Sequence, residues 1–157
     1  MTRSVVRMLA VATAALASAF GAYAAPAQES VIHYVTGESK YPFSPAVRAG
    51  NTVYLSGQIG AGASGGLGKD FETQAHLAMD NVMSAAKLAG MGPENIAKCT
   101  VMLADMKNWA AFNEIYRSYF KAGKFPARSA FGVTGLALGA ALEVECIGYV
   151  TTPAVSR

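Results

Sequence analysis

The hydrophobic residues of this chain repeat with two different periods, and each period predicts a different kind of element. Segments rich in β-branched and aromatic residues predict strands at about 31–35, in both arms of 46–56, and at about 96–104, 128–133 and 142–151. The arms of 46–56 flank Gly50 and Asn51, a pair that tolerates a positive φ. This segment is therefore predicted to be a tight β-hairpin.

Two other segments place apolar residues three or four positions apart, which is the spacing of one face of an α-helix. The first runs from Asp70 to Ala89 and is followed by Gly90, a residue typical of a helix C-terminus. The second has candidate N-caps at Asp105 and Asn108 and is expected to end near Gly123. Its buried stripe is predicted to consist of Trp109, Phe112, Tyr116 and Tyr119.

These elements predict a single α+β domain with a mixed β-sheet of five or six strands and two helices packed on one face. A chain of 157 residues has room for one domain with a proper core. Because two helices can cover only one face of such a sheet, the other face would leave an apolar patch in water. We therefore expect the chain to oligomerise through the uncovered face.

The first 24 residues differ in composition from the rest. Arg3 and Arg7 carry their only charges, Met8–Phe20 contains no charged residue, and Ala22–Ala24 is a small-x-small sequence. This pattern predicts a signal peptide at 1–24 that is cleaved after Ala24. The alternative is an uncleaved N-terminal anchor. Residues 25–40 would then form a lead-in with the first strand, and 41–152 the folded domain of a protein that is exported, periplasmic or secreted, without membrane association after cleavage.

Composition excludes several classes of function. Removal of Arg3 and Arg7 leaves 11 basic against 10 acidic residues, a net charge of about +1, which is no nucleic-acid footprint. The histidines, His33 and His76, lie far from any cluster of metal ligands, so no metal site is predicted. The only cysteines, Cys99 and Cys146, lie in apolar strand segments and are expected to stay unpaired and buried.

One glycine pattern imitates a dinucleotide-binding motif. Gly60–Gly65 spells GxGxxG between a strand and a helix, but the helix does not open at the third glycine. Asp80, which has the spacing of a ribose-binding acid, falls inside the helix. Gly68–Asp70 also lacks the hydroxyl of a P-loop. The segment is therefore interpreted as a flexible hairpin loop.

A few polar residues in apolar segments are candidates for chemistry. Arg128 opens one predicted strand and Glu143 opens another, and such charges are costly to bury without a partner or a ligand. The pair could be an internal ion bridge, or a guanidinium that holds a carboxylate beside a general base. Glu145 shares the face of Glu143 in a regular strand and could replace it. Asn113 lies on the apolar stripe of the second helix, and Ser56 ends a hairpin arm.

Several motifs together resemble the RidA (YjgF) family of reactive-intermediate deaminases. Pro126–Ser129 followed by Leu142–Glu145 resembles the C-terminal signature of that family. Asn51–Ile59 resembles its second-strand segment, Met79–Val82 its first helix and Asn113–Tyr116 its second helix. The resemblance covers roughly 41–150, and several spaced motifs are more specific than one.

The resemblance implies a chorismate-mutase-like fold and a homotrimer whose sheets form an inner barrel, with sites in the clefts between subunits. It implies hydrolysis of 2-imino acids, such as 2-iminopropanoate and 2-iminobutanoate, to 2-oxo acids and ammonia without a cofactor. Arg128 would hold the substrate carboxylate and Glu143 would activate water. Ser56 and Asn113 match site positions, and the backbone around Ala130 would contact the imine nitrogen.

Two positions depart from the pattern of that family. Phe43 stands where many members have a tyrosine, and Ala130 stands where many have a cysteine. The missing hydroxyl at Phe43 could change the substrate preference. An alternative function is a non-catalytic binding module that keeps the arginine pocket for small carboxylates. A chaperone-like or ribonuclease role is the third, although a nearly neutral domain gives RNA little to bind.

Overall fold

The computed structural model of the chain describes residues 31–37 and 41–151. The predicted signal peptide, its cleavage site and residues 25–30 and 38–40 of the lead-in lie outside this part of the chain. Within it, no helix combines the length and the apolarity that a membrane crossing needs.

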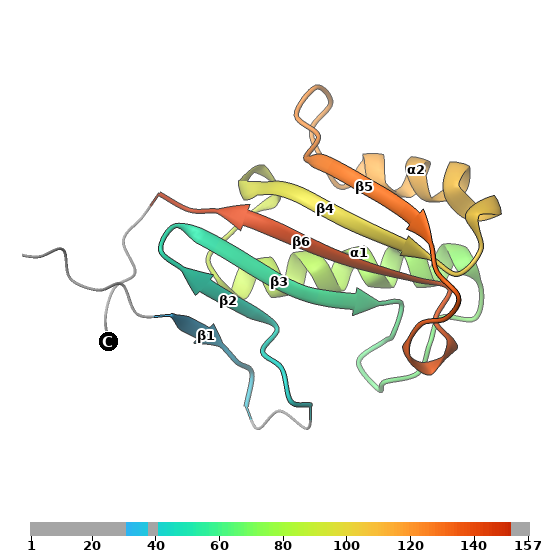
Figure 1. The fold of residues 1–157 in the computed structure, drawn as a ribbon, viewed down its shortest axis with the longest axis horizontal. Coiled ribbons are helices and arrows are strands. Elements are labelled where there is room, and N and C mark those ends of the chain that lie inside the picture. The colour runs from blue at the N-terminus through green and yellow to red at the C-terminus, as the bar shows by residue number, and fades with distance from the viewer. Residues whose placement is uncertain (1–30, 38–40, 152–157) are drawn as a thin grey trace, which may run out of the picture.

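Six strands form one mixed sheet in the order β1-β2-β3-β6-β4-β5 (Figure 1). All neighbours are antiparallel except β4 and β5, which run parallel. The predicted hairpin is confirmed: β2 and β3 are joined at Gly50, whose φ is 59°. The strands are β1 (Ile32–Tyr34), β2 (Ala46–Ala49), β3 (Thr52–Ile59), β4 (Ile96–Leu103), β5 (Ala127–Gly132) and β6 (Leu142–Tyr149).

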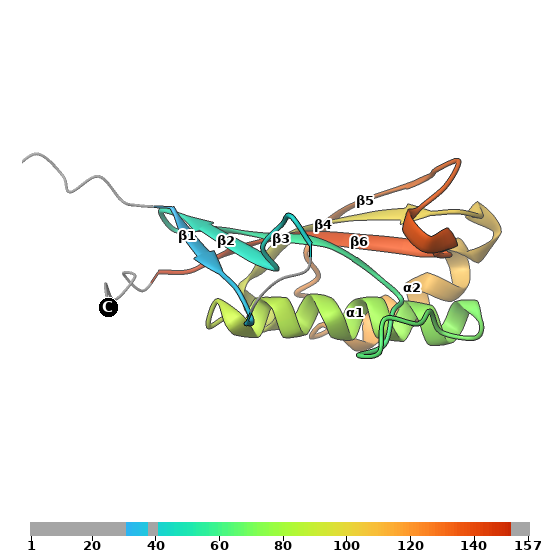
Figure 2. The same cartoon turned by 90° about the horizontal axis from the view of Figure 1, so that it is seen from below.

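Both long helices, α1 (Phe71–Leu88) and α2 (Trp109–Ser118), lie on the same face of this sheet, as predicted (Figure 2). The side chain of Asp70 accepts a hydrogen bond of 2.8 Å from the backbone N–H of Thr73 and so caps α1. Hydrogen bonding to the side chain of Thr73, together with this backbone bond, lowers the pKa of Asp70. The described residues also contain three short 3₁₀ turns: η1 (Pro93–Asn95), η2 (Met106–Asn108) and η3 (Ala137–Gly139).

The core lies between the helices and the sheet. On α1 the buried face is rich in alanine, which lets this helix approach the strands closely. In β6, buried and exposed residues alternate from Leu142 onward, so that every second side chain points toward the helices. The largest fully buried side chains are Phe112, Met79, Leu103, Leu142, Val53, Val82, Val101 and Val144.

The predicted end of the second helix near Gly123 is wrong, because α2 ends at Ser118. The hydroxyl of Ser118 donates a hydrogen bond of 2.7 Å to the carbonyl of Ile115, which competes with the helical pattern. Asp105 caps the 3₁₀ turn η2 by accepting from the N–H of Lys107, and Asn108 caps nothing with its side chain.

The expectation that the two cysteines stay unpaired is also wrong. Cys99 of β4 and Cys146 of β6 form a disulfide. Their antiparallel register places them directly opposite each other, and both side chains point into the core with their Cα atoms 4.1 Å apart. Two opposed cysteines on one face of neighbouring strands are within bonding reach.

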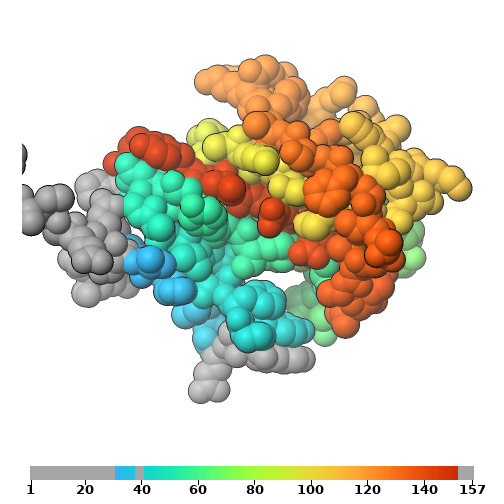
Figure 3. All heavy atoms as spheres, in the orientation of Figure 1, coloured from blue at the N-terminus to red at the C-terminus, as the bar shows by residue number. Residues whose placement is uncertain are grey.

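The other face of the sheet carries neither α1 nor α2 (Figure 2) and exposes several large apolar side chains. Figure 3 shows this face, with β3, β6 and β4 running across it. We call it the open face. The side chains of Tyr54, Phe131 and Tyr149 are about half exposed there, and that of Ile147 is 37% exposed. This is the surface that the sequence assigns to oligomerisation, and the described residues of a single chain leave it uncovered.

Candidate functional site

Arg128 lies at the edge of the sheet, with its side chain turned toward α2. In the parallel register it is opposite Cys99, whose side chain is buried beneath the helices. Its guanidinium donates a short hydrogen bond to the side-chain oxygen of Asn113. The same group lies 4.7 Å from the ring centre of Tyr116 and 5.6 Å from that of Trp109. These α2 residues are three or four positions apart, so their side chains lie on one face of the helix and contact the guanidinium together.

A hollow of about 320 Å³ opens beside this guanidinium. Two guanidinium groups and a side-chain amide line it, together with the ring of Tyr116. Arg117 makes an exposed ion pair of 3.6 Å with Glu114, whereas Arg128 has no carboxylate partner among the residues that the structure describes. Such a hollow suits a small anion. Its lining residues are Asn113, Tyr116, Arg117, Phe125, Pro126 and Arg128.

Tyr116 brings a buried hydroxyl to the edge of this hollow. The hydroxyl has no hydrogen-bond partner within the described part of the chain. Burial raises the pKa of Tyr116 to about 12, although the positive charge of Arg128 acts in the opposite direction. The phenol therefore stays protonated at neutral pH.

Glu143 lies on the other side of the sheet. In β6 the buried neighbours Leu142 and Val144 face the helices, so Glu143 faces away from them on the open face. Glu143 pairs with Met102 of β4, whereas Arg128 pairs with Cys99, three residues earlier on the same strand. The interpretation as an internal ion bridge is therefore wrong for a single chain. Glu145 shares the open face, as predicted, and is more exposed.

The carboxylate of Glu143 rests on β3 at Gly57. A Cβ atom built on Gly57 would lie 1.9 Å from Oε1 of Glu143. The pairing of β3 with β6 is interrupted between Leu55 and Gln58, so Ser56 and Gly57 form a bulge. Sequence reasoning named Ser56 but missed Gly57. The signal was a glycine inside a strand, which often marks a bulge or a close approach.

The hydroxyl of Ser56 is occupied within the chain. It donates a hydrogen bond of 2.7 Å to the carbonyl of Ser44, and the N–H of Ser56 donates to the carbonyl of Pro45. The side chain of Gln58 donates back to the carbonyl of Ser56. Through these hydrogen bonds, Ser56 of β3 holds the segment that follows Phe43 against the strand.

Phe43 borders a second, larger hollow of about 840 Å³. Its ring stacks on that of Tyr41 with centres 5.5 Å apart, and both residues are more than half exposed. Leu138 of η3 borders the same hollow, is 71% exposed and has a φ of 58°, which is unusual for leucine. Sequence reasoning missed Tyr41 and Leu138.

Ala130 lies on the helix-side face of β5 with Arg128 and packs against the core.

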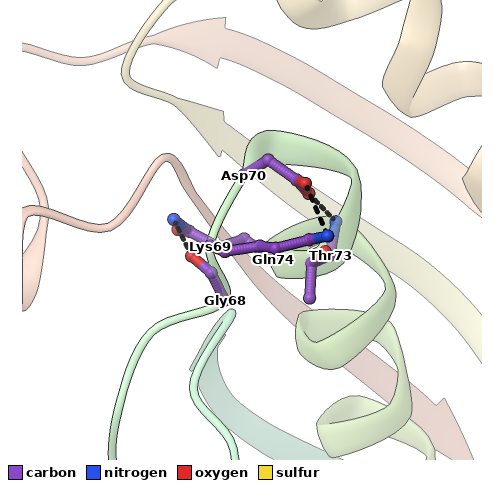
Figure 4. Close-up of polar contacts among 5 residues, drawn as sticks. All are labelled: Gly68, Lys69, Asp70, Thr73 and Gln74. Atoms are coloured by element: carbon purple, nitrogen blue, oxygen red, sulfur yellow. Dashed lines mark hydrogen bonds and ion pairs between the residues drawn. The ribbon is translucent and has the colours of Figure 1, made fainter.

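The glycine-rich loop before α1 is a hairpin loop, as predicted. Ala61 and Leu67 pair across it. Figure 4 shows Gln74 donating to the carbonyl of Gly68, while Asp70 caps the helix start. A Cβ atom on Gly60 would lie 2.4 Å from the backbone of Gln74, so this glycine serves close packing. The carboxylate of Asp70 already accepts a hydrogen bond from a backbone N–H at this helix N-terminus, the kind of group that binds a nucleotide phosphate in dinucleotide-binding folds.

The described structure places the predicted site residues in two separate groups. The hollow with Arg128 and Asn113 lies at the α2 edge. Glu143 lies with Gly57 on the open face. Within the described ranges, no group of three or more histidine, cysteine, aspartate or glutamate side chains could hold a metal ion.

Comparison with known proteins supports one common fold. Residues 36–150 match the model of the family described as Endoribonuclease L-PSP. The chain is 40% identical over 116 residues to the human 2-iminobutanoate/2-iminopropanoate deaminase, covering 71% of this chain and 84% of that protein.

Two solved structures from E. coli superpose on most of the chain. The YjgF gene product is 30% identical, with a TM-score of 0.70, over 75% of this chain and 98% of that one. TdcF with bound serine is also 30% identical, with a TM-score of 0.68, over 75% of this chain and 94% of that one. The predicted α+β domain and its resemblance to these proteins are thereby confirmed.

Proposed function

Because the chain belongs to the RidA/YjgF/L-PSP family, we propose that it hydrolyses 2-imino acids such as 2-iminobutanoate and 2-iminopropanoate to 2-oxo acids and ammonia. The observation that carries this proposal is Arg128, a guanidinium that has no carboxylate partner among the described residues and lies beside a hollow lined by a second guanidinium and an amide. A small substrate carboxylate supplies the missing partner, since its two oxygens match the planar fork of a guanidinium.

Each residue has one task in the proposed reaction. Arg128, steadied by Asn113 and the rings of α2, orients the carboxylate. Glu143 takes a proton from a water molecule as the water oxygen bonds to the C=N carbon. Glu143 returns this proton to the nitrogen, which gives a carbinolamine. The hydroxyl proton of the carbinolamine then moves to the nitrogen, the C–N bond breaks, ammonia leaves and the carbonyl forms. Backbone groups around Ala130 would contact the imine nitrogen. No cofactor takes part in this scheme.

The proposal includes a homotrimer. Arg128 and Glu143 lie on opposite faces of the sheet in one chain, so a cleft between two copies is the arrangement that can bring the two groups together. The exposed apolar side chains of the open face support burial against other copies, as an inner barrel would provide.

We further propose that the protein works outside the cytoplasm. The composition of residues 1–24 supports export, and the disulfide between Cys99 and Cys146 supports folding in an oxidising compartment. Mass spectrometry of the mature N-terminus tests this part directly. An intact Met1 on a soluble cytoplasmic protein would contradict it.

The second candidate is a non-catalytic module that binds small carboxylates. The separation of Arg128 from Glu143 in one chain favours it, because binding needs only the half with the arginine. An amino-acid oxidase that generates 2-iminopropanoate in a coupled assay distinguishes the two. Faster loss of imine supports the enzyme, and binding of 2-oxobutanoate without turnover supports the module.

Glu143→Gln sharpens this assay, because it keeps the shape of the side chain but removes the base. We expect turnover to fall about a hundredfold or more, with nearly unchanged affinity for 2-oxobutanoate. Glu145→Gln is the matched control on the same strand and face. Undiminished activity in a folded Glu143→Gln protein, with loss in Glu145→Gln, would transfer the role to Glu145.

A further inference from the structure

Gly57 is the residue of β3 that lies under the carboxylate of Glu143. A Cβ atom at this position would meet three atoms of that side chain: Oε1 at 1.9 Å, Cδ at 2.9 Å and Cγ at 3.2 Å. The nearest three atoms all belong to Glu143, so nothing else is closer to the place of the missing side chain. Hydrogen in place of a side chain is what allows the carboxylate to lie there.

Backbone conformation does not explain this glycine. The residues with positive φ in the described part of the chain include Gly50 and Gly90 but not Gly57. An alanine could therefore adopt the backbone of Gly57 without strain. The three nearest atoms that alanine would meet all belong to the flexible side chain of Glu143, which can move aside at little cost in stability.

The side chains of Ser56 and Gln58, on either side of Gly57, form their hydrogen bonds away from the Glu143 carboxylate. Ser56 donates its hydroxyl to the carbonyl of Ser44, and Gln58 donates its amide to the carbonyl of Ser56. Glu143 itself has no hydrogen bond or ion pair with any residue that the structure describes. The described residues therefore leave its oxygens without a hydrogen-bond donor, and the backbone of Gly57 sets how far the carboxylate can approach β3.

We propose that Gly57 is a positioning residue: by having no side chain, it holds the Glu143 carboxylate in the place from which that carboxylate acts on water. The inference deepens the proposed imine hydrolysis and rests on it for its kinetic consequence. Displacement of a general base by about 1 Å can lower turnover about a hundredfold while substrate binding is kept. Arg128, which would bind the carboxylate of the substrate, lies apart from Gly57. The substitution should therefore lower kcat and leave KM nearly unchanged.

The test is a double-mutant cycle between Gly57→Ala and Glu143→Gln, measured as imine hydrolysis by the full mature protein. We expect Gly57→Ala to lower kcat about tenfold to a hundredfold, with KM within about threefold and an unchanged melting temperature. In the Glu143→Gln background, the same substitution should change kcat less than about twofold, because it acts only through the carboxylate.

Gly135→Ala is the matched control. This glycine has no atom within 4 Å of an added Cβ and no positive φ, so its substitution should leave kcat and KM unchanged. Unchanged kcat in Gly57→Ala would overturn the inference. Equal losses from Gly57→Ala with and without Glu143 would also overturn it, because they would indicate a role that does not pass through the carboxylate.

A second readout separates this inference from the proposed function. The side-chain carboxyl ¹³C signal of Glu143, assigned by its absence in Glu143→Gln, should shift in Gly57→Ala but not in Gly135→Ala. If the wild-type protein hydrolyses no imine yet this shift is seen, the positioning holds and the proposed function fails. If the signal does not move, Gly57 does not position Glu143, whatever the activity.

Discussion

Cys99 and Cys146 face each other across β4 and β6 and join the two strands at the centre of the core by a disulfide. The bond closes a loop over a sequence separation of 47 residues. A loop of this length is expected to stabilise the fold by about 2–4 kcal/mol, mainly by restricting the unfolded chain.

The disulfide can be tested in denaturant. The double variant Cys99→Ala/Cys146→Ala should lose at least this free energy of unfolding, because two buried side chains are also shortened. A strong reductant should destabilise the wild-type protein but not the double variant. An equal effect of reductant on both proteins would contradict a structural role for the bond.

The cysteines show what sequence patterns can and cannot predict. Apolar alternation located the strands that contain Cys99 and Cys146, because burial on one face imposes a period of two. It did not give the register between β4 and β6, which depends on contacts far apart in the sequence. A slip of one residue would have turned either side chain to the opposite face. The hydrophobic pattern predicted both strands, but it could not predict the disulfide between them.

Tyr116→Phe should stabilise the protein. The hydroxyl is buried without a hydrogen-bond partner in the described part of the chain, and its removal relieves a desolvation cost of about 1 kcal/mol or more. Tyr119→Phe is the control, because the hydroxyl of Tyr119 donates to Asp80 at 2.8 Å and its loss should destabilise. Urea unfolding of both variants at neutral pH measures the difference. A less stable Tyr116→Phe protein would indicate a partner for that hydroxyl.

The same residue predicts a dependence of stability on alkaline pH. The pKa of Tyr116 is raised from 10.0 to about 12 in the folded chain because burial disfavours the phenolate. As the pH rises through this range, the unfolded chain releases the proton before the folded chain does, so the free energy of unfolding falls. Tyr116→Phe should flatten this decline between pH 10 and 12. Burial also raises the pKa of Tyr119, so a smaller decline should persist.

Arg128→Lys should weaken substrate binding while keeping the charge. A lysine lacks the planar fork and cannot stack on the ring of Tyr116 in the same way. We expect affinity for 2-oxobutanoate to fall at least about tenfold, with the melting temperature changed little, since Arg128 has no buried ion-pair partner among the described residues. Arg117→Lys, at the exposed rim of the same hollow, is the control and should bind nearly as the wild type. Calorimetric titration of both variants measures this.

Arg128 and Glu143 were both named from the sequence, but their relation was not. Each is a charged residue at the start of an apolar strand, and that signal is local. Whether the two side chains share a face depends on the pairing of β5 with β4 and of β4 with β6. Gly57 was missed for a similar reason, because its meaning comes from a side chain of another strand.

The proposed trimer can be tested at Ile147, which lies on the open face opposite Lys98. In a single chain, an aspartate at this position would face the ammonium of Lys98 across the two strands, so the fold should be retained. Between subunits the same carboxylate would have to leave water, and an interface that buries it would be weakened by several kcal/mol. We therefore expect light scattering to show a trimer for the wild type and a smaller species for Ile147→Asp. Imine hydrolysis should fall as the oligomer dissociates, because in one chain the two halves of the proposed site lie on opposite faces of the sheet.

Leu88→Asp places the same charge on the helical side, at a residue that is 40% exposed, and should leave the trimer and its activity intact. A wild-type protein that stays monomeric at micromolar concentration would contradict the trimer, and full activity of monomeric Ile147→Asp would show that one chain holds a complete site.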